Sequence, residues 1–91
     1  MSTRSSILHL NLHREYFAQI VAGTKRIEYR KRTAYCKARL EGRRYDVIQF
    51  RNGYSTKAPE MQVEFRGICK IKKWGKPQYA IRLGRILKIK R

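Results

Sequence analysis

Three charged residues, Lys25, Glu28 and Arg30, stand close together in the chain at a spacing that suits a binding or catalytic site. A strand is expected over about Arg26 to Arg32, and side chains alternate between the two faces of a strand. Glu28 and Arg30 would then point one way and Tyr29 the other. Because Lys25 directly precedes the strand, it could meet Glu28 and Arg30 at one end of a sheet.

These three side chains could carry out more than one kind of chemistry. Lys25 could act as a base or nucleophile, or as a fixed cation that binds a phosphate or an oxyanion. Glu28 could activate water or accept hydrogen bonds from the exocyclic amine of a base, and Arg30 offers a planar fork for a phosphate or a guanine edge. The alternative is a structural ion pair that braces the end of a sheet, and the sequence leaves both interpretations open.

A second candidate segment is Arg51-Asn52-Gly53-Tyr54. Arginine and asparagine can bind base edges, glycine allows a backbone to approach closely, and tyrosine can stack on an unpaired base of single-stranded RNA. The alternative is an ordinary turn after a strand. We predict that Arg51, Asn52, Gly53 and Tyr54 form the rim of a site whose floor is Lys25, Glu28 and Arg30, with Tyr29 beside it.

Other polar residues give weaker signals. His9 and His13 are expected on one face of a strand, but four strand residues span roughly 13 Å, which is long for joint acid–base work at one phosphate. Cys36 and Cys69 form no CxxC pair, and the acids are scattered. We therefore expect surface histidines, free thiols, and neither a metal site nor a cofactor.

The charge of the chain indicates its partner. Twenty-three Lys and Arg residues against six acids give a net charge of +17 over 91 residues, which predicts binding to a polyanion. No apolar run reaches the roughly 18 residues of a membrane span, and the first residues lack the apolar core of a secretion signal. We expect a cytoplasmic protein with no membrane contact that binds RNA, preferentially single-stranded, or a nucleotide. DNA is a possible competitor, and a monomer is favoured.

Hydrophobic patterning divides the chain into a loose tail over residues 1–6 and a single domain over residues 7–91. Strands are expected over Ile7 to His13, Arg26 to Arg32, Tyr45 to Arg51, Met61 to Trp74 and Tyr79 to Ile89. Helices are expected over Arg14 to Ala22, ended by Gly23, and over Thr33 to Leu40, capped by Thr33, with Tyr35, Ala38 and Leu40 packing inward. Glycine bends are expected in the long strands at Gly67 and Gly84.

These elements predict an α+β fold, a small mixed β-barrel of about five strands, closed or nearly closed, with one or two short flanking helices. A flat open sheet of this length would leave unprotected edges.

The motif Gly23-x-Lys25-x-x-Glu28-x-Arg30 after a short helix resembles the signature of the ASCH domain, a PUA-like barrel. The segments Phe50 to Tyr54, Ala58-Pro59 and Val63 to Ile68 are similar to a compact bacterial and phage branch of that family. The resemblance implies a cleft beside the motif and a role in RNA binding or RNA modification. Some relatives hydrolyse acylated cytidine, and others are reported as ribonucleases.

In the amidohydrolase branch, the lysine that matches Lys25 is catalytic, a threonine is common at the position of Glu28, and a further acid comes from late in the chain. This sequence differs because it has Glu28 there and no acid after Glu64. RNA binding is therefore our first prediction. The alternative is a metal-independent hydrolase of RNA, or of an acylated nucleoside such as N4-acetylcytidine, with Lys25 as base or nucleophile and Glu28 as its partner. A third possibility is a structural partner of another protein.

Overall fold

The computed structural model describes residues 6–53, 55 and 57–90. Within them the chain forms five strands and two helices, which confirms the expected α+β content. In chain order these are β1 (Ile7–Asn11), α1 (Arg14–Ala22), β2 (Ile27–Lys31), α2 (Ala34–Leu40), β3 (Val47–Arg51), β4 (Glu60–Lys73) and β5 (Lys76–Lys90).

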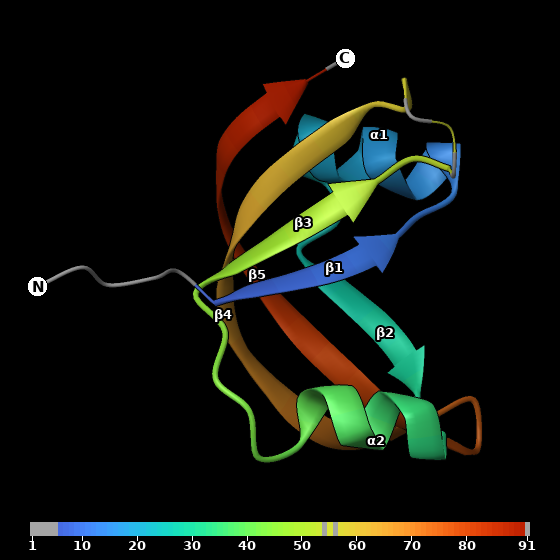
Figure 1. Ribbon diagram of the computed structural model, residues 1–91. Helices are drawn as coiled ribbons and strands as arrows, with labels where there is room; N and C mark the ends of the chain where they lie inside the picture. Colours follow the sequence, from blue (N-terminus) through green and yellow to red (C-terminus); the bar gives the residue numbers. More distant parts are fainter. Residues whose placement is uncertain (1–5, 54, 56, 91) are drawn as a thin grey trace, which may run out of the picture.

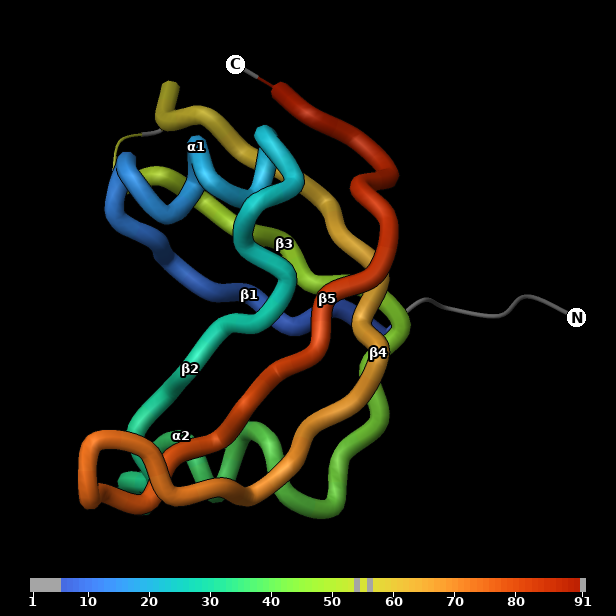
Figure 2. Tube along the Cα trace, turned by 180° about the vertical axis from the view of Figure 1, so that it is seen from behind, coloured from blue at the N-terminus to red at the C-terminus, as the bar shows by residue number. Residues whose placement is uncertain are grey.

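The strands form one mixed sheet in the order β1-β3-β4-β5-β2. Strand β1 runs parallel to β3, and the other neighbouring pairs are antiparallel. The long β4–β5 hairpin curves through the middle of the sheet, and the two helices lie near its opposite ends (Figure 1). Seen from behind, β2 lies alongside β5 and ends beside the tip of the hairpin (Figure 2).

The expected small mixed fold of five strands and two helices is confirmed, but the sheet is not closed into a barrel. Strands β1 and β2 are the two edges of the sheet, and they are not paired with each other within the described residues. One side chain bridges them, because the Arg30 guanidinium of β2 donates a hydrogen bond of 2.7 Å to the carbonyl of Asn11 in β1. Within the described residues, this side chain rather than a backbone ladder connects the two edges.

Both predicted irregularities of the long strands have a physical basis in the structure. The β4–β5 register shifts between Phe65 and Gly67, where Gly67 has a φ of 120° that favours glycine. Gly84 is required for a different reason, since a Cβ atom there would lie 2.7 Å from the Cβ of Glu64. The first glycine therefore allows a bulge, and the second allows two strands to approach closely.

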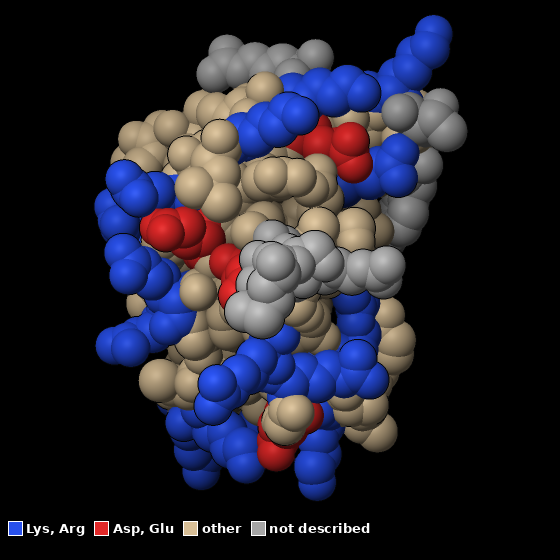
Figure 3. Space-filling model, turned by 60° about the vertical axis from the view of Figure 1, so that its left-hand side comes forward, with Lys and Arg blue, Asp and Glu red and all other residues tan. Residues whose placement is uncertain are grey.

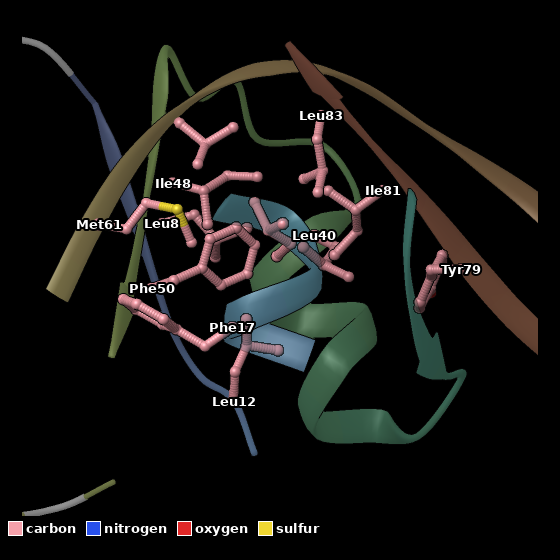
Figure 4. Close-up of a cluster of buried hydrophobic side chains, with 12 residues drawn as sticks. Leu8, Leu12, Phe17, Leu40, Ile48, Phe50, Met61, Tyr79, Ile81 and Leu83 are labelled. Atoms are coloured by element: carbon pink, nitrogen blue, oxygen red, sulfur yellow. The ribbon is translucent and has the colours of Figure 1, made fainter. Parts of the chain in front are cut away.

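The hydrophobic core is formed by four of the five strands and by both helices (Figure 4). Its buried residues are Leu8, Leu12, Phe17, Ile20, Leu40, Ile48, Phe50, Met61, Val63, Tyr79, Ile81 and Leu83. Strand β2 contributes none of them. The one buried residue of β2 is Glu28, so this strand presents a charge to the interior where the others present apolar side chains.

Helix α2 begins as predicted, because the Thr33 hydroxyl accepts a hydrogen bond from the backbone of Cys36. The expected inward packing was wrong for Tyr35, which is 68% exposed, and for Ala38, which is also exposed. Cys36 and Leu40, four residues apart on one helical face, are the residues that approach the core.

A buried tyrosine ties the end of α2 to the sheet. The Tyr79 hydroxyl of β5 donates a hydrogen bond to the carboxylate of Glu41, which also lies 3.2 Å from the ammonium of Lys70. Burial, followed by this bond, raises the pKa of Tyr79 to about 12. The same bond, followed by Lys70, lowers the pKa of Glu41.

We expect Tyr79→Phe to be less stable than the wild-type chain by a margin that is largest near neutral pH. The stabilisation that depends on ionised Glu41 is present above its ordinary pKa of 4.5 and is lost as the pH falls through its lowered folded-state value. As the pH rises from 10.0 to about 12, the unfolded tyrosine ionises while the folded one keeps its proton, which removes stability from the wild type alone.

Urea unfolding of both chains across the pH range checks this expectation. Effects of the other acids cancel in the difference between the two chains. A stability difference that stays constant from acid to alkaline pH would contradict it.

Candidate functional site

An open cleft of about 1130 Å³ lies along the gap between β1 and β2. Four parts of the chain line it: the end of β1 with the start of α1, strand β2, the loop that follows β3, and the tip of the β4–β5 hairpin. Residues far apart in the sequence therefore meet around one hollow, and its position follows directly from the failure of the sheet to close.

The carboxylate of Glu28 forms the floor of the cleft and is only 5% exposed. One of its oxygens, Oε1, lies 3.3 Å from the ammonium of Lys25. The other, Oε2, accepts a hydrogen bond of 2.8 Å from Arg30 Nε and lies in ion-pair contact with Arg30 Nη2 at 2.7 Å. A buried carboxylate is costly without such partners, so the three charges form one structural unit.

Local structure explains why the three residues of the motif meet. Gly23 adopts the left-handed conformation with a φ of 82°, and helix α1 ends there. The backbone of Lys25 then bonds to the carbonyl of Gln19, which holds the lysine against the end of the helix. Strand β2 pairs antiparallel with β5, where Glu28 lies opposite Ile81. Both residues are buried.

Lys25 is held by several contacts besides Glu28. Its ammonium donates a hydrogen bond of 2.7 Å to the carbonyl of Ile27. It also lies 5.2 Å from the ring centroid of Tyr16 and 5.7 Å from that of Tyr29. These are distances at which an aromatic face attracts a cation. The lysine is thus presented to the cleft as a positioned cation.

The second predicted segment reaches the cleft only in part. Asn52 and Gly53 line it. The structure does not bring Arg51 there, because its guanidinium Nη2 donates to the carbonyl of Ser55 and its Nε is buried. Arg51 was expected to contact a ligand, but its side chain instead holds the loop that follows β3. Tyr54 lies outside the described residues.

The two histidines are separated by the fold. His13 lines the cleft next to Tyr16, with ring centroids 6.1 Å apart. His9 lines a second, smaller hollow beside α2, together with Tyr35. This arrangement does not bring the two imidazoles to one phosphate.

The most conspicuous cleft residue that the sequence did not indicate is Trp74, at the tip of the β4–β5 hairpin. It was expected simply to end a strand. The available signal was its place in Lys73-Trp74-Gly75-Lys76, an aromatic side chain between two lysines next to a turn glycine. Asn11, Arg14, Lys31 and Lys76 also line the cleft without having been singled out.

The charge of the lining is strongly asymmetric. Its cations are Arg14, Lys25, Arg30, Lys31 and Lys76, and Glu28 is the one acid among the described residues that line it. Basic side chains are not confined to the cleft, since another face of the molecule also carries Lys and Arg at its margins and lower end (Figure 3). Positive charge is therefore spread over more of the molecule than the cleft alone.

No group of three or more His, Cys, Asp and Glu side chains in the described residues lies close enough to hold a metal ion. Neither described helix is long and apolar enough to cross a membrane.

A five-stranded mixed sheet with two short helices and a polar cleft at its edge defines a small α+β domain of the PUA-like class. The model of the ASCH domain family matches residues 10–83, and the chain belongs to that family. Searches of curated proteins and of solved structures found no match.

We expect the Glu28–Arg30 pair to stabilise the fold as well as shape the cleft. Arg30→Met leaves Oε2 of Glu28 without its cation and the Asn11 carbonyl without its donor, which should cost about 2 kcal/mol or more. Because the two residues are in direct contact, the double variant Glu28→Gln with Arg30→Met should lose less than the sum of the single variants, by about 0.5–3 kcal/mol.

Chemical denaturation of the four chains gives this coupling energy. Arg26→Met is the matched control, since Arg26 is exposed and does not line the cleft. It should change stability by no more than about 0.5 kcal/mol. Additive losses at Glu28 and Arg30 would refute the coupling.

Proposed function

We propose that this ASCH domain binds RNA, with an unpaired nucleotide entering the cleft between β1 and β2. The observation that carries the proposal is the cleft floor, where buried Glu28 is fixed between Lys25 and Arg30 in an otherwise cationic lining. The net charge of +17 supports a polyanionic ligand.

The floor supports recognition of a base as well as of a phosphate. An ionised carboxylate has about four lone-pair sites. Arg30 Nε takes one of them on Oε2 with a hydrogen bond, and Arg30 Nη2 and the Lys25 ammonium lie in ion-pair contact with Oε2 and Oε1. Oε1 therefore has acceptor capacity left, which suits the exocyclic amine of cytosine, adenine or guanine. Asn52, with both a donor and an acceptor, lines the same cleft.

Single-stranded RNA fits this arrangement better than a duplex. The amine of a paired base is already engaged in base pairing, and the bases of an RNA helix are hard to reach through its narrow major groove. An unpaired base can turn outward and enter a hollow of this kind, while the flanking phosphates stay near the lysines of the rim.

We expect RNA affinity to fall as the salt concentration rises and to depend on the lysines of the cleft. Lys31→Gln combined with Lys76→Gln should weaken binding and reduce the slope of log affinity against log salt by about 1.4, since each lost phosphate contact on a single strand is worth about 0.7. Fluorescence anisotropy of a labelled single-stranded RNA across a salt series measures both quantities.

Lys88→Gln combined with Lys90→Gln is the matched control. Both lysines are exposed on β5 and lie outside the cleft lining, and the variant has the same net charge as the cleft variant. An equal loss of affinity in both variants would show that general charge attraction, rather than the cleft, accounts for binding. A DNA strand of the same sequence tests the preference for RNA.

Hydrolysis is the second candidate, favoured by one observation, the contact of 3.3 Å between the Lys25 ammonium and the Glu28 carboxylate on the cleft floor. A lysine beside a carboxylate is a pair that an amide hydrolase could use, with Lys25 as base or nucleophile. Against this, Lys25 already donates to the Ile27 carbonyl, and both Glu28 oxygens are held by cations. These contacts suit a fixed binding site better than proton transfer.

We therefore expect binding without product when the protein is incubated with N4-acetylcytidine or with single-stranded RNA. Chromatography would detect cytidine and acetate from the nucleoside, and shorter fragments from the RNA. Lys25→Ala and the exposed-lysine control Lys88→Ala are assayed beside the wild type. Product that disappears in Lys25→Ala but remains in Lys88→Ala would identify a hydrolase instead.

A further inference from the structure

Trp74 is displayed at the mouth of the cleft in an unusual way. It is the single tryptophan of the chain, it is 74% exposed, and it lines the cleft from the tip of the β4–β5 hairpin. Most large aromatic side chains bury much of their surface, so an indole in open solvent beside a binding cleft is a candidate contact for a ligand.

The backbone that carries the indole is also unusual. Trp74 has a φ of 54° and Gly75 a φ of 70°, so both central residues of the hairpin turn have positive φ. Such a turn favours Asn-Gly or Asp-Gly, and a bulky residue at the first position costs conformational energy. Strain of this kind concentrates at functional sites, and nothing in the folded core explains it here, because the indole is not part of the core.

Two neighbours fix the direction of the indole. The ring of Tyr29 on β2 packs against it edge to face, with centroids 6.2 Å apart and planes at 69°. The ammonium of Lys73 lies 3.7 Å from the ring centroid of Tyr29 and 4.7 Å from that of Trp74. The indole is thus oriented by Tyr29 and by the Lys73 ammonium over its ring, while most of its surface stays exposed.

We propose that Trp74 is a stacking platform on which an unpaired base of the bound RNA lies as the strand passes the mouth of the cleft. This inference rests on the proposed function and adds a second base position outside the Glu28 floor. Every base has a π-face, so stacking on an exposed aromatic ring between cations binds single strands without reading their sequence. Lys73 and Lys76, on either side of Trp74 in the chain, supply the cations for the flanking phosphates.

The surroundings of Trp74 favour a nucleic acid over a protein as its partner. The core of a protein interface is depleted of charged residues. The neighbours of Trp74 are instead the cations Lys73 and Lys76 and the ring of Tyr29, which carries a polar hydroxyl.

The test is the affinity of Trp74→Ala and Trp74→Phe for a labelled single-stranded RNA. We expect Trp74→Ala to bind roughly tenfold more weakly than the wild type, and Trp74→Phe to retain most of the affinity. Tyr35→Ala is the matched control, because Tyr35 is a comparably exposed aromatic residue that lies outside the cleft lining. It should bind as the wild type does. Thermal unfolding of each variant checks that the fold is intact.

The fluorescence of the single tryptophan gives an independent readout that a purely structural role would not change. Stacking should quench the indole when RNA is added, and an RNA of the same length in which all bases are removed should quench it far less. Abasic RNA should also reduce the difference in affinity between the wild type and Trp74→Ala.

The outcomes separate the two proposals. In one outcome the wild type binds RNA and the double variant of Lys31 and Lys76 binds it more weakly, but Trp74→Ala has wild-type affinity and RNA leaves the tryptophan fluorescence unchanged. This outcome refutes the stacking platform and leaves the cleft proposal standing. If the wild type does not bind RNA at all, both proposals fall. Equal losses for Trp74→Ala and Tyr35→Ala would also refute a specific role for Trp74.

Discussion

The buried carboxylate of Glu28 is the constraint on which the rest of the site depends. Strand β2 turns this charge towards an interior that the other strands fill with apolar side chains. The charge can stay there only with partners, and Lys25 and Arg30 provide them from the two sides. Because Lys25 is positioned by the end of α1 and Arg30 reaches across to β1, one ion cluster determines how three elements of the domain meet.

Arg30 of this cluster and Arg39 of α2 together explain how the open sheet avoids an unprotected edge at β1. Strand β1 has a free edge whose carbonyls could pair with another chain. The carbonyl of Asn11 accepts a hydrogen bond from Arg30, and that of His9 accepts one from Arg39 of α2. Two guanidinium groups thus occupy positions that a neighbouring strand would take in a closed barrel. They protect the edge and keep the space that becomes the cleft.

Local signals in the sequence were sufficient to predict the helices and strands and the ion cluster of Lys25, Glu28 and Arg30. Gly23 and Thr33 marked helix ends through their own backbone and side-chain chemistry, and alternation placed Glu28 and Arg30 on one face. Properties that depend on distant parts of the chain could not be predicted in this way. Three such properties are the closure of the sheet, which depends on what lies between β1 and β2, the contact of Arg51 with the Ser55 carbonyl, and the exposure of Trp74 on a tight turn where a strand was expected to end.

The hydrogen bond between Arg30 and Asn11 also sets the width of the cleft. In a closed barrel, widening the space between two strands breaks a ladder of backbone hydrogen bonds. Here β1 and β2 are joined by the guanidinium of one side chain, which is part-exposed at the cleft. A phosphate that bound this guanidinium would compete with the Asn11 carbonyl for the same donors. Within the described residues, this side of the cleft is thus joined by a side chain and not by a backbone ladder.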